Sequence, residues 1–301
     1  MSLRVLMTAT NQFHKVLILL PAKTVIALMA LCSASVLQAA VVFKSLNSSI
    51  TIPATAIQGG LLLGMTEPGN TVWLDNNKVQ IAADGSFIIG FGRTALNAEL
   101  KVLSKVGVEE VQNIKVQSRE YNVDRIDGLP PAKVNPKGEA VLKRIKSESR
   151  LVKRARKTAH PRQNFKEGFI WPAKGRISGV YGSQRILNGD PKWPHYGLDI
   201  AAPTGADVIA PVSGIVTLAH NDMYYSGGTL ILDHGQGLSS TFLHLSEILV
   251  KEGQYIDKGA VIAKVGATGR VTGAHLDWRI NWFTIRLDPQ FLVDGISQDS
   301  R

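Results

Sequence analysis

Cysteine is almost missing from this sequence: Cys32 is the single one among 301 residues. One cysteine excludes an internal disulfide framework and a zinc site built from several thiolates. Because Cys32 lies inside an N-terminal apolar stretch, we expect no thiol chemistry in the rest of the chain. Cysteine usage therefore neither supports nor opposes an oxidising compartment.

A long uninterrupted apolar run is also missing. Pro21 and Lys23 separate VLILL (16–20) from VIALMALCSASVL (25–37), whereas a membrane span needs about 20 consecutive apolar residues. The preceding basic residues, the apolar run and the QAA that follows are typical of a secretory signal, so we predict that residues 1–40 direct export, with cleavage near Ala39. An uncleaved membrane anchor through residues 16–40 is the second interpretation. Both place the protein in the periplasm or cell envelope.

Negative charge is scarce relative to positive charge. The chain has 34 Lys and Arg against 24 Asp and Glu, which gives a formal charge of +10. Such an excess favours an anionic partner, although solubility alone is an alternative explanation. For an exported protein we expect an acidic wall polymer or lipid headgroups and no nucleic acid.

Residues 41–128 contain short β-rich segments separated by the turn signals EPGN, DNN and ADG. This pattern predicts a small antiparallel β-sandwich. Trp73, Phe87 and Phe91 lie in those segments and admit two interpretations, a ligand-stacking stripe or core residues. Alternating apolar residues in strands favour the core.

Residues 129–167 have a different character. Pro130 and Pro131 interrupt the strand pattern, and apolar residues then recur at helical spacing from Lys137 to about Thr158. We predict a linker that contains a basic connecting helix. Its cations can bind an acidic polymer, but a solvated helix is favoured; they are Lys143, Arg144, Lys146, Arg150, Lys153, Arg154, Arg156 and Lys157.

Residues 168–293 return to short strands between glycines, with no long helical pattern. We predict a compact, mostly antiparallel β domain there, followed by a tail at 294–301. The fold class is therefore mostly β, with two β regions joined by the basic helix. The sequence does not indicate an oligomeric state.

Five polar residues stand out in this last region. His195 and Asp199 lie in PHYGLD, His244 lies in TFLHLS, and His275 and Asp277 lie in GAHLD. Residues two apart on a strand share a face, so His275 and Asp277 can point at one site. Three imidazoles and two carboxylates are what a zinc hydrolase requires, whereas separately satisfied core or turn histidines are the alternative.

The motifs that hold these residues resemble those of the lysostaphin-like zinc peptidases, family M23 with a LytM-type domain. The resemblance runs from about Phe169 to Leu292, through HYGLDIAAPTGADVIAP, TFLHL, GQYIDKGAVIAKVGATG and TGAHLD. It implies that His195 and Asp199 bind zinc and that Asp277 occupies the third ligand position, where the family has histidine. It also implies that His244 and His275 act on the attacking water and the substrate carbonyl.

Aspartate at the third ligand position has an electrostatic consequence. Its oxygen binds zinc at about the same distance as a histidine nitrogen, roughly 2.0 to 2.2 Å. Two carboxylates and one imidazole, however, leave the zinc site formally neutral, so a bound water is acidified less. Arg279, two residues along the same strand face, is a candidate for a compensating cation.

The resemblance implies a zinc metalloendopeptidase that hydrolyses peptide cross-links in peptidoglycan. The alternative is a catalytically inactive module of the same family that binds the cell wall or regulates another wall hydrolase. Two further sites are weaker candidates. His234 is expected to be structural, whereas His220, with Tyr224 and Tyr225, either lines a cleft or packs in a loop.

Overall fold

The computed structural model describes residues 49–293, all of which fall within one compact unit. The predicted signal or anchor in residues 1–40, Cys32 within it, and the tail at 294–301 lie outside the described residues. None of the helices within 49–293 is long and apolar enough to cross a membrane. The division into residues 41–128, 129–167 and 168–293 stays a prediction.

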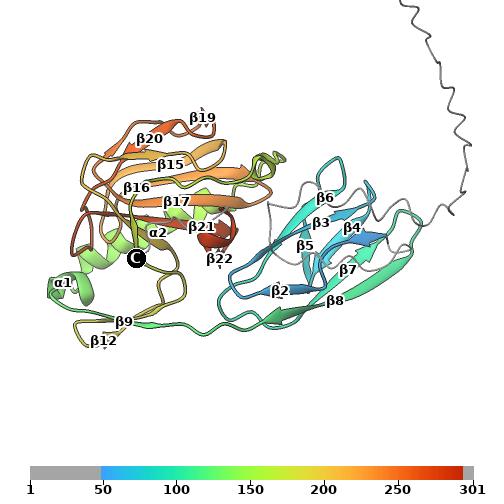
Figure 1. Cartoon of the computed structure of the whole chain (residues 1–301), viewed down its shortest axis with the longest axis horizontal. Helices are drawn as coiled ribbons and strands as arrows, with labels where there is room; N and C mark the ends of the chain where they lie inside the picture. The colour runs from blue at the N-terminus through green and yellow to red at the C-terminus, as the bar shows by residue number, and fades with distance from the viewer. Residues whose placement is uncertain (1–48, 294–301) are drawn as a thin grey trace, which may run out of the picture. The chain divides into compact units, whose positions relative to one another are not determined.

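The N-terminal β region consists of two sheets (Figure 1). Its strands are β1 (Ile50–Thr51), β2 (Thr55–Ile57), β3 (Leu61–Thr66), β4 (Thr71–Leu74), β5 (Asn77–Val79), β6 (Ser86–Gly90), β7 (Ala98–Leu103) and β8 (Glu109–Gln117). One sheet has the order β1-β3-β6, and the other has the order β2-β8-β7-β4-β5. The pairing is antiparallel as predicted, except that β2 runs parallel to β8.

The aromatic residues of this region divide between core and surface. Phe87 and Phe91 are buried, which supports the core interpretation. Trp73 is only half-buried, because it alternates on β4 with the buried Val72 and Leu74. The Nζ atom of Lys101 lies 5.4 Å from the Trp73 ring centroid, so a cation covers this outward-facing ring.

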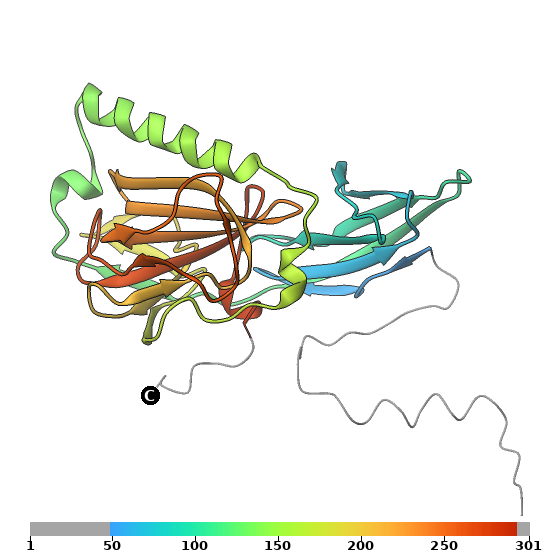
Figure 2. The same ribbon diagram turned by 90° about the horizontal axis from the view of Figure 1, so that it is seen from above.

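The connecting segment contains β9 (Val123–Ile126), α1 (Pro131–Val134), α2 (Glu139–Lys157) and η2 (Asn164–Glu167). The predicted basic helix is therefore present, but it is not simply solvated. Helix α2 lies across the main sheet of the C-terminal β region, where its half-buried Leu151 and Val152 and its buried Ala155 pack against a small apolar cluster (Figure 2). That cluster includes Leu218 and Ile231, so an apolar stripe orients the helix.

The C-terminal β region is built around one eight-stranded sheet. Its strands follow the order β10-β13-β21-β17-β16-β15-β19, and β22 pairs with β21. The elements are β10 (Arg176–Gly179), β11 (Gln184–Leu187), β12 (Asp190–Pro191), β13 (Leu198–Ala201), β14 (Asp207–Ile209), β15 (Gly214–Met223), β16 (Gly227–Gly235), β17 (Leu238–Leu245), β18 (Glu247–Ile248), β19 (Tyr255–Ile256), β20 (Val261–Lys264), β21 (His275–Trp282), β22 (Ile285–Leu287) and η3 (Pro289–Phe291).

Every pairing within the eight-stranded sheet is antiparallel, as predicted. One pairing outside it was not expected: β9 from the connecting segment runs parallel to β11.

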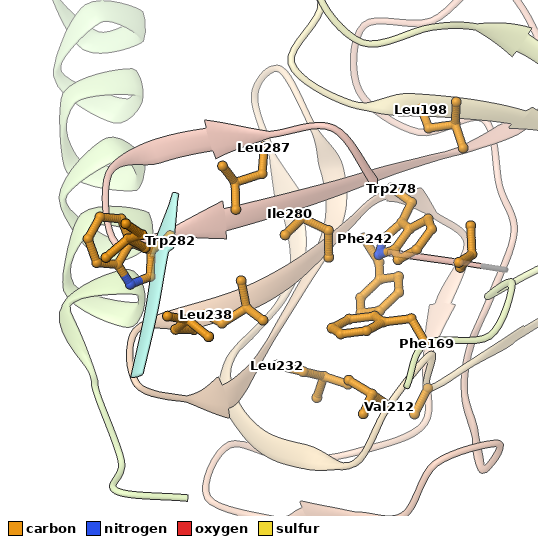
Figure 3. Close-up of a cluster of buried hydrophobic side chains, with 14 of the residues drawn as sticks. Phe169, Leu198, Val212, Leu232, Leu238, Phe242, Trp278, Ile280, Trp282 and Leu287 are labelled. Atoms are coloured by element: carbon orange, nitrogen blue, oxygen red, sulfur yellow. The ribbon is translucent and has the colours of Figure 1, made fainter. Parts of the chain in front are cut away.

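Strand β21 separates the core from the polar residues of interest. Leu276, Trp278 and Ile280 are fully buried on one face, with Phe242 of β17 opposite Trp278 (Figure 3). Because strand side chains alternate, the residues between them project from the other face. The packed apolar face therefore fixes where the His275 and Asp277 side chains point.

Candidate metal centre

Neighbouring strands bring the five predicted residues together. Asp199 on β13 pairs directly with Asp277 on β21, and His275 pairs with Ala201. His195 precedes β13 and is held by backbone hydrogen bonds, of which one runs from its N–H to Ser183 O at 2.8 Å. His244 lies near the end of β17, the other neighbour of β21, and its ring centroid is 4.9 Å from that of His275.

The atoms of His195, Asp199 and Asp277 that could bind a metal ion lie close together. All three lie within 4.8 Å of one another, and His195 Nε2 is 3.0 Å from Asp199 Oδ1 and 3.5 Å from Asp277 Oδ2. Tetrahedral zinc holds its ligand atoms about 3.4 Å apart. His195 Nε2 and Asp199 Oδ1 are buried, and within residues 49–293 neither forms a hydrogen bond of regular geometry despite their short separation. Their chemistry and spacing thus fit a metal ion.

Each carboxylate of this set is also paired with an arginine. Arg279 donates from Nε to Asp277 Oδ1 at 2.9 Å and from Nη2 to Asp277 Oδ2 at 2.5 Å, which makes the pair bidentate. Arg185 Nη2 donates to Asp199 Oδ2 at 2.9 Å. Arg279 was identified from the sequence as a candidate cation. Arg185 was missed, because the loop geometry that brings β11 to this site leaves no sequence signal.

Two glycines leave room for these carboxylates. A Cβ atom at Gly197 would collide with Asp277 Oδ1 and with the Arg279 side chain. A Cβ atom at Gly179 would collide with Asp199 Oδ2. The glycines of HYGLD and GRISG therefore do more than turn the chain, because any larger residue would push a carboxylate out of place.

Backbone carbonyls fix the tautomers of the other two histidines. His244 Nδ1 lies 2.8 Å from Thr268 O, and His275 Nδ1 lies 2.9 Å from Gly273 O. A carbonyl only accepts, so each Nδ1 must carry the hydrogen and each Nε2 of the neutral ring keeps a free lone pair. His275 Nε2 faces Asp199 Oδ1 at 3.8 Å. Both rings thus present a proton acceptor on the polar side of the sheet.

The backbone at His244 is strained. Its φ angle is +65°, a conformation that non-glycine residues rarely adopt. Its N–H donates to Ser226 O at 2.8 Å, which helps to hold the conformation. Strain of this kind is concentrated at functional sites, where surrounding structure keeps a side chain in place.

Burial and charge set the protonation of the histidines. Burial lowers the pKa of His195, but the carboxylates of Asp277 and Asp199 outweigh it, so the pKa is raised. Burial, partly opposed by Asp277, lowers the pKa of His244 to about 4. Burial also acts to raise the pKa of Asp277, but Arg279 and His195 hold it well below its usual value. His244 is therefore neutral and Asp277 ionised at neutral pH.

The remaining predicted histidines lie outside this group. His234 is fully buried, with Nδ1 2.9 Å from Ser213 O and Nε2 2.8 Å from Ser240 Oγ, which matches a structural role. His220 lines a surface hollow beside α2 together with Arg144 and Asp222. Tyr224 donates from its hydroxyl to Ala132 O at 2.7 Å, so it packs the connecting segment against this loop.

Comparison with known proteins places the site in a family. Residues 193–289 match the family model "Peptidase family M23". The chain is 27% identical over 212 residues to the peptidoglycan DD-endopeptidase ShyA of Vibrio cholerae, which covers 65% of this chain and 48% of that protein. It is 41% identical over 87 residues to ShyB of the same organism, covering 29% of this chain and 20% of that protein. The chain thus spans about half or less of the length of these relatives.

A solved structure extends the likeness beyond the matched residues. A putative peptidase M23 from Pseudomonas aeruginosa superposes with a TM-score of 0.63 at 28% sequence identity. The superposition covers 80% of this chain and 96% of that one. Motifs, matched residues and fold agree, and the chain contains a peptidase family M23 domain of the LytM/lysostaphin-like kind.

Proposed function

We propose that the chain is a zinc-dependent endopeptidase that hydrolyses peptide bonds in peptidoglycan, in the cross-links between stem peptides. The observation that carries the proposal is the convergence of His195 Nε2, Asp199 Oδ1 and Asp277 Oδ2. The first two are buried and form no hydrogen bond of regular geometry with any described residue. The names of the V. cholerae relatives supply the substrate class. The excess of basic residues favours an anionic wall polymer.

The side chains divide the catalytic tasks between them. His195, Asp199 and Asp277 would hold zinc, which supplies the Lewis acidity that activates water and polarises a carbonyl near neutral pH. The Nε2 atom of one of the two rings, His244 or His275, would accept the proton that the attacking water loses. Once protonated, either ring donates that proton to the leaving amine or stabilises the developing oxyanion.

The arginine partners offset the negative charge that a second carboxylate ligand adds to the zinc site. Asp199, Asp277 and a neutral His195 neutralise the two charges of zinc, but Arg279 and Arg185 each add one positive charge at 2.5 and 2.9 Å from a ligand carboxylate. A hydrogen-bonded carboxylate is a weaker electron donor, and nearby cations favour deprotonated water. The two guanidinium groups would therefore offset the extra negative charge of Asp277, which stands where the family has a neutral histidine.

Digestion of purified, cross-linked peptidoglycan tests this function. The protein is incubated with the polymer with and without a zinc chelator, and the released fragments are identified by mass spectrometry. Loss of cross-linked dimers that the chelator prevents is the expected result. Unchanged dimers in zinc-loaded samples would contradict it.

A second candidate function is a non-catalytic module that binds the wall or regulates another wall hydrolase. The specific observation in its favour is the bidentate Arg279–Asp277 pair, in which a guanidinium already contacts both oxygens of the third ligand. Binding of intact peptidoglycan without zinc and without cleavage would favour this alternative.

Export to the periplasm or cell envelope is part of the proposed function. It rests on residues 1–40 of the sequence and on the peptidoglycan relatives. Anchoring through residues 16–40 stays the alternative to cleavage. Cell fractionation with an antibody to the C-terminal domain, with and without a high-pH wash, separates a soluble periplasmic protein from an anchored one.

A further inference from the structure

Three arginines lie in one row next to Asp277. Arg279 follows Asp277 on the same face of β21, and its cross-strand partner on β17 is Thr241. Arg156 reaches this row from α2, because its Nη2 donates to Thr241 Oγ1 at 3.0 Å. Arg286 on β22 lies opposite Asn281, and its Nη1 donates to Asn281 Oδ1 at 3.3 Å. Helix α2 and the strands β21 and β22 thus direct three guanidinium groups to one place.

These cations outnumber the carboxylates beside them. Arg279 pairs with Asp277, but within residues 49–293 neither Arg156 nor Arg286 forms an ion pair with a carboxylate. Arg156 is only 8% exposed, and its buried Nε has no hydrogen-bond partner among the described residues. A buried guanidinium without a counter-ion is costly, and an incoming anion would remove that cost.

Their mutual repulsion shows how closely the three groups interact. Burial lowers the pKa of Arg156, and the neighbouring Arg286 and Arg279 lower it further. Burial and Arg279 lower the pKa of Arg286 to about 10. Arg279 and Arg286 are partly exposed, so an anion can reach them from solvent, whereas Arg156 is buried.

We propose that Arg156, Arg279 and Arg286, here called the arginine row, bind a carboxylate of the peptide on which the metal centre acts. Planar guanidinium groups match a carboxylate with paired hydrogen bonds, which suits this arrangement better than a compact ammonium would. This inference rests on the proposed function, because it assigns the substrate of that same site.

The spacing along β21 indicates where this carboxylate lies in the substrate. Asp277 and Arg279 are two residues apart on a strand, which is about 7 Å. An extended peptide covers the same distance in about two residues. The carboxylate therefore belongs one or two residues from the cleaved bond, where the chain terminus of the peptide would supply it.

A pair of peptides tests the arginine row. Titration calorimetry measures the binding of the full chain to an acetylated tetrapeptide that ends in D-alanyl-D-alanine and to the same peptide with a C-terminal amide. We expect the carboxylate form to bind at least about tenfold tighter, the effect of one charge-assisted hydrogen-bond pair. Equal affinities of the two peptides would overturn the proposal. Inorganic phosphate that stabilises the protein would not rescue it, because that result would show only general anion binding.

Variants locate the preference. Arg156→Met and Arg286→Gln are expected to reduce the carboxylate-to-amide ratio to about threefold or less, because each removes one guanidinium partner. Arg154→Met is the matched control, since Arg154 is an exposed arginine on the same helix, and it should keep the wild-type ratio. A wild-type ratio in both row variants would overturn the proposal. Should Arg156→Met fail to fold, Arg286→Gln alone decides.

The binding measurement needs no hydrolysis, so the two proposals fail separately. A carboxylate preference in a protein that leaves peptidoglycan dimers intact contradicts the endopeptidase and not the arginine row. Chelator-sensitive loss of dimers by a protein that binds both peptides equally contradicts the arginine row and not the endopeptidase. Mass spectrometry of the peptides after titration shows whether they stayed intact.

Discussion

Both faces of strand β21 contain buried residues, but one carries apolar side chains and the other carries polar and charged ones. On one face Leu276, Trp278 and Ile280 are fully buried among apolar neighbours. On the other face Asp277 is equally buried, yet it lies against a guanidinium and beside buried polar atoms that form no hydrogen bond of regular geometry within residues 49–293. The apolar face is complete without a ligand. The polar face contains buried polar atoms without regular hydrogen bonds, as expected of a site that binds a ligand.

The largest expected effect is on the polar face. Asp199→Ala removes a proposed zinc ligand and leaves Arg185 without its carboxylate. If the proposed function holds, we expect loss of zinc and a fall in the cleavage of peptidoglycan dimers of at least about a thousandfold, or about 4 kcal/mol of transition-state stabilisation. Timed peptidoglycan digestion measures it. Asp207→Ala, at an exposed carboxylate on β14, is the control and should retain activity. Comparable activity in both variants would mean that the polar residues beside β21 are not needed for activity.

Trp278→Ala tests the apolar face. Removing a fully buried tryptophan should lower the free energy of unfolding by about 4 kcal/mol, through lost burial and the cavity left behind. Urea denaturation followed by circular dichroism measures it. A variant as stable as wild type would mean that this face does not hold β21 in place.

A pH titration probes a histidine that belongs to the core. Burial lowers the pKa of His234 to about 4, whereas an unfolded histidine titrates near 6.5. The unfolded state therefore binds the extra proton between those values, and stability falls as pH decreases from about 6.5 to about 4, by up to about 1.4 kcal/mol per pH unit. Urea midpoints across this range measure the slope. His234→Asn should flatten it, and an unchanged slope would contradict the assignment.

Ile280→Val is the smallest expected effect. It removes one methylene from the apolar face and should cost about 1 kcal/mol of unfolding free energy while leaving zinc content unchanged. Thermal unfolding and metal analysis check the two statements together. Loss of zinc in this variant would show that the two faces are not independent.

Much of this arrangement could be predicted from the sequence. Alternation in HLDWRINW determines which residues of β21 share a face, and the spacing of His195 and Asp199 places both beside β21 once β13 pairs with it. Both are local patterns, so they are readable in one chain. The helix from 139 to 157 was also readable from its apolar spacing.

The rest depends on packing between distant segments. Arg156 looked like one more solvated cation on a basic helix, but α2 lies on the sheet and carries it to Thr241. Arg185 comes from β11, which is aligned by a parallel pairing with β9 that no local pattern indicates. The bidentate geometry of Arg279 on Asp277 likewise depends on the room left by Gly197. Charges placed by tertiary contacts are therefore the part that sequence reasoning missed.

The zinc content of the purified protein decides whether His195, Asp199 and Asp277 form a metal centre. The wild type, Asp277→Ala and Asp277→His proteins are saturated with zinc, exchanged into metal-free buffer and analysed for bound metal per chain. We predict one zinc in the wild type, none in Asp277→Ala and retained zinc in Asp277→His, because histidine supplies a ligand atom at the same position. A wild type without zinc, or an Asp277→Ala protein that binds as much as the wild type, would contradict it.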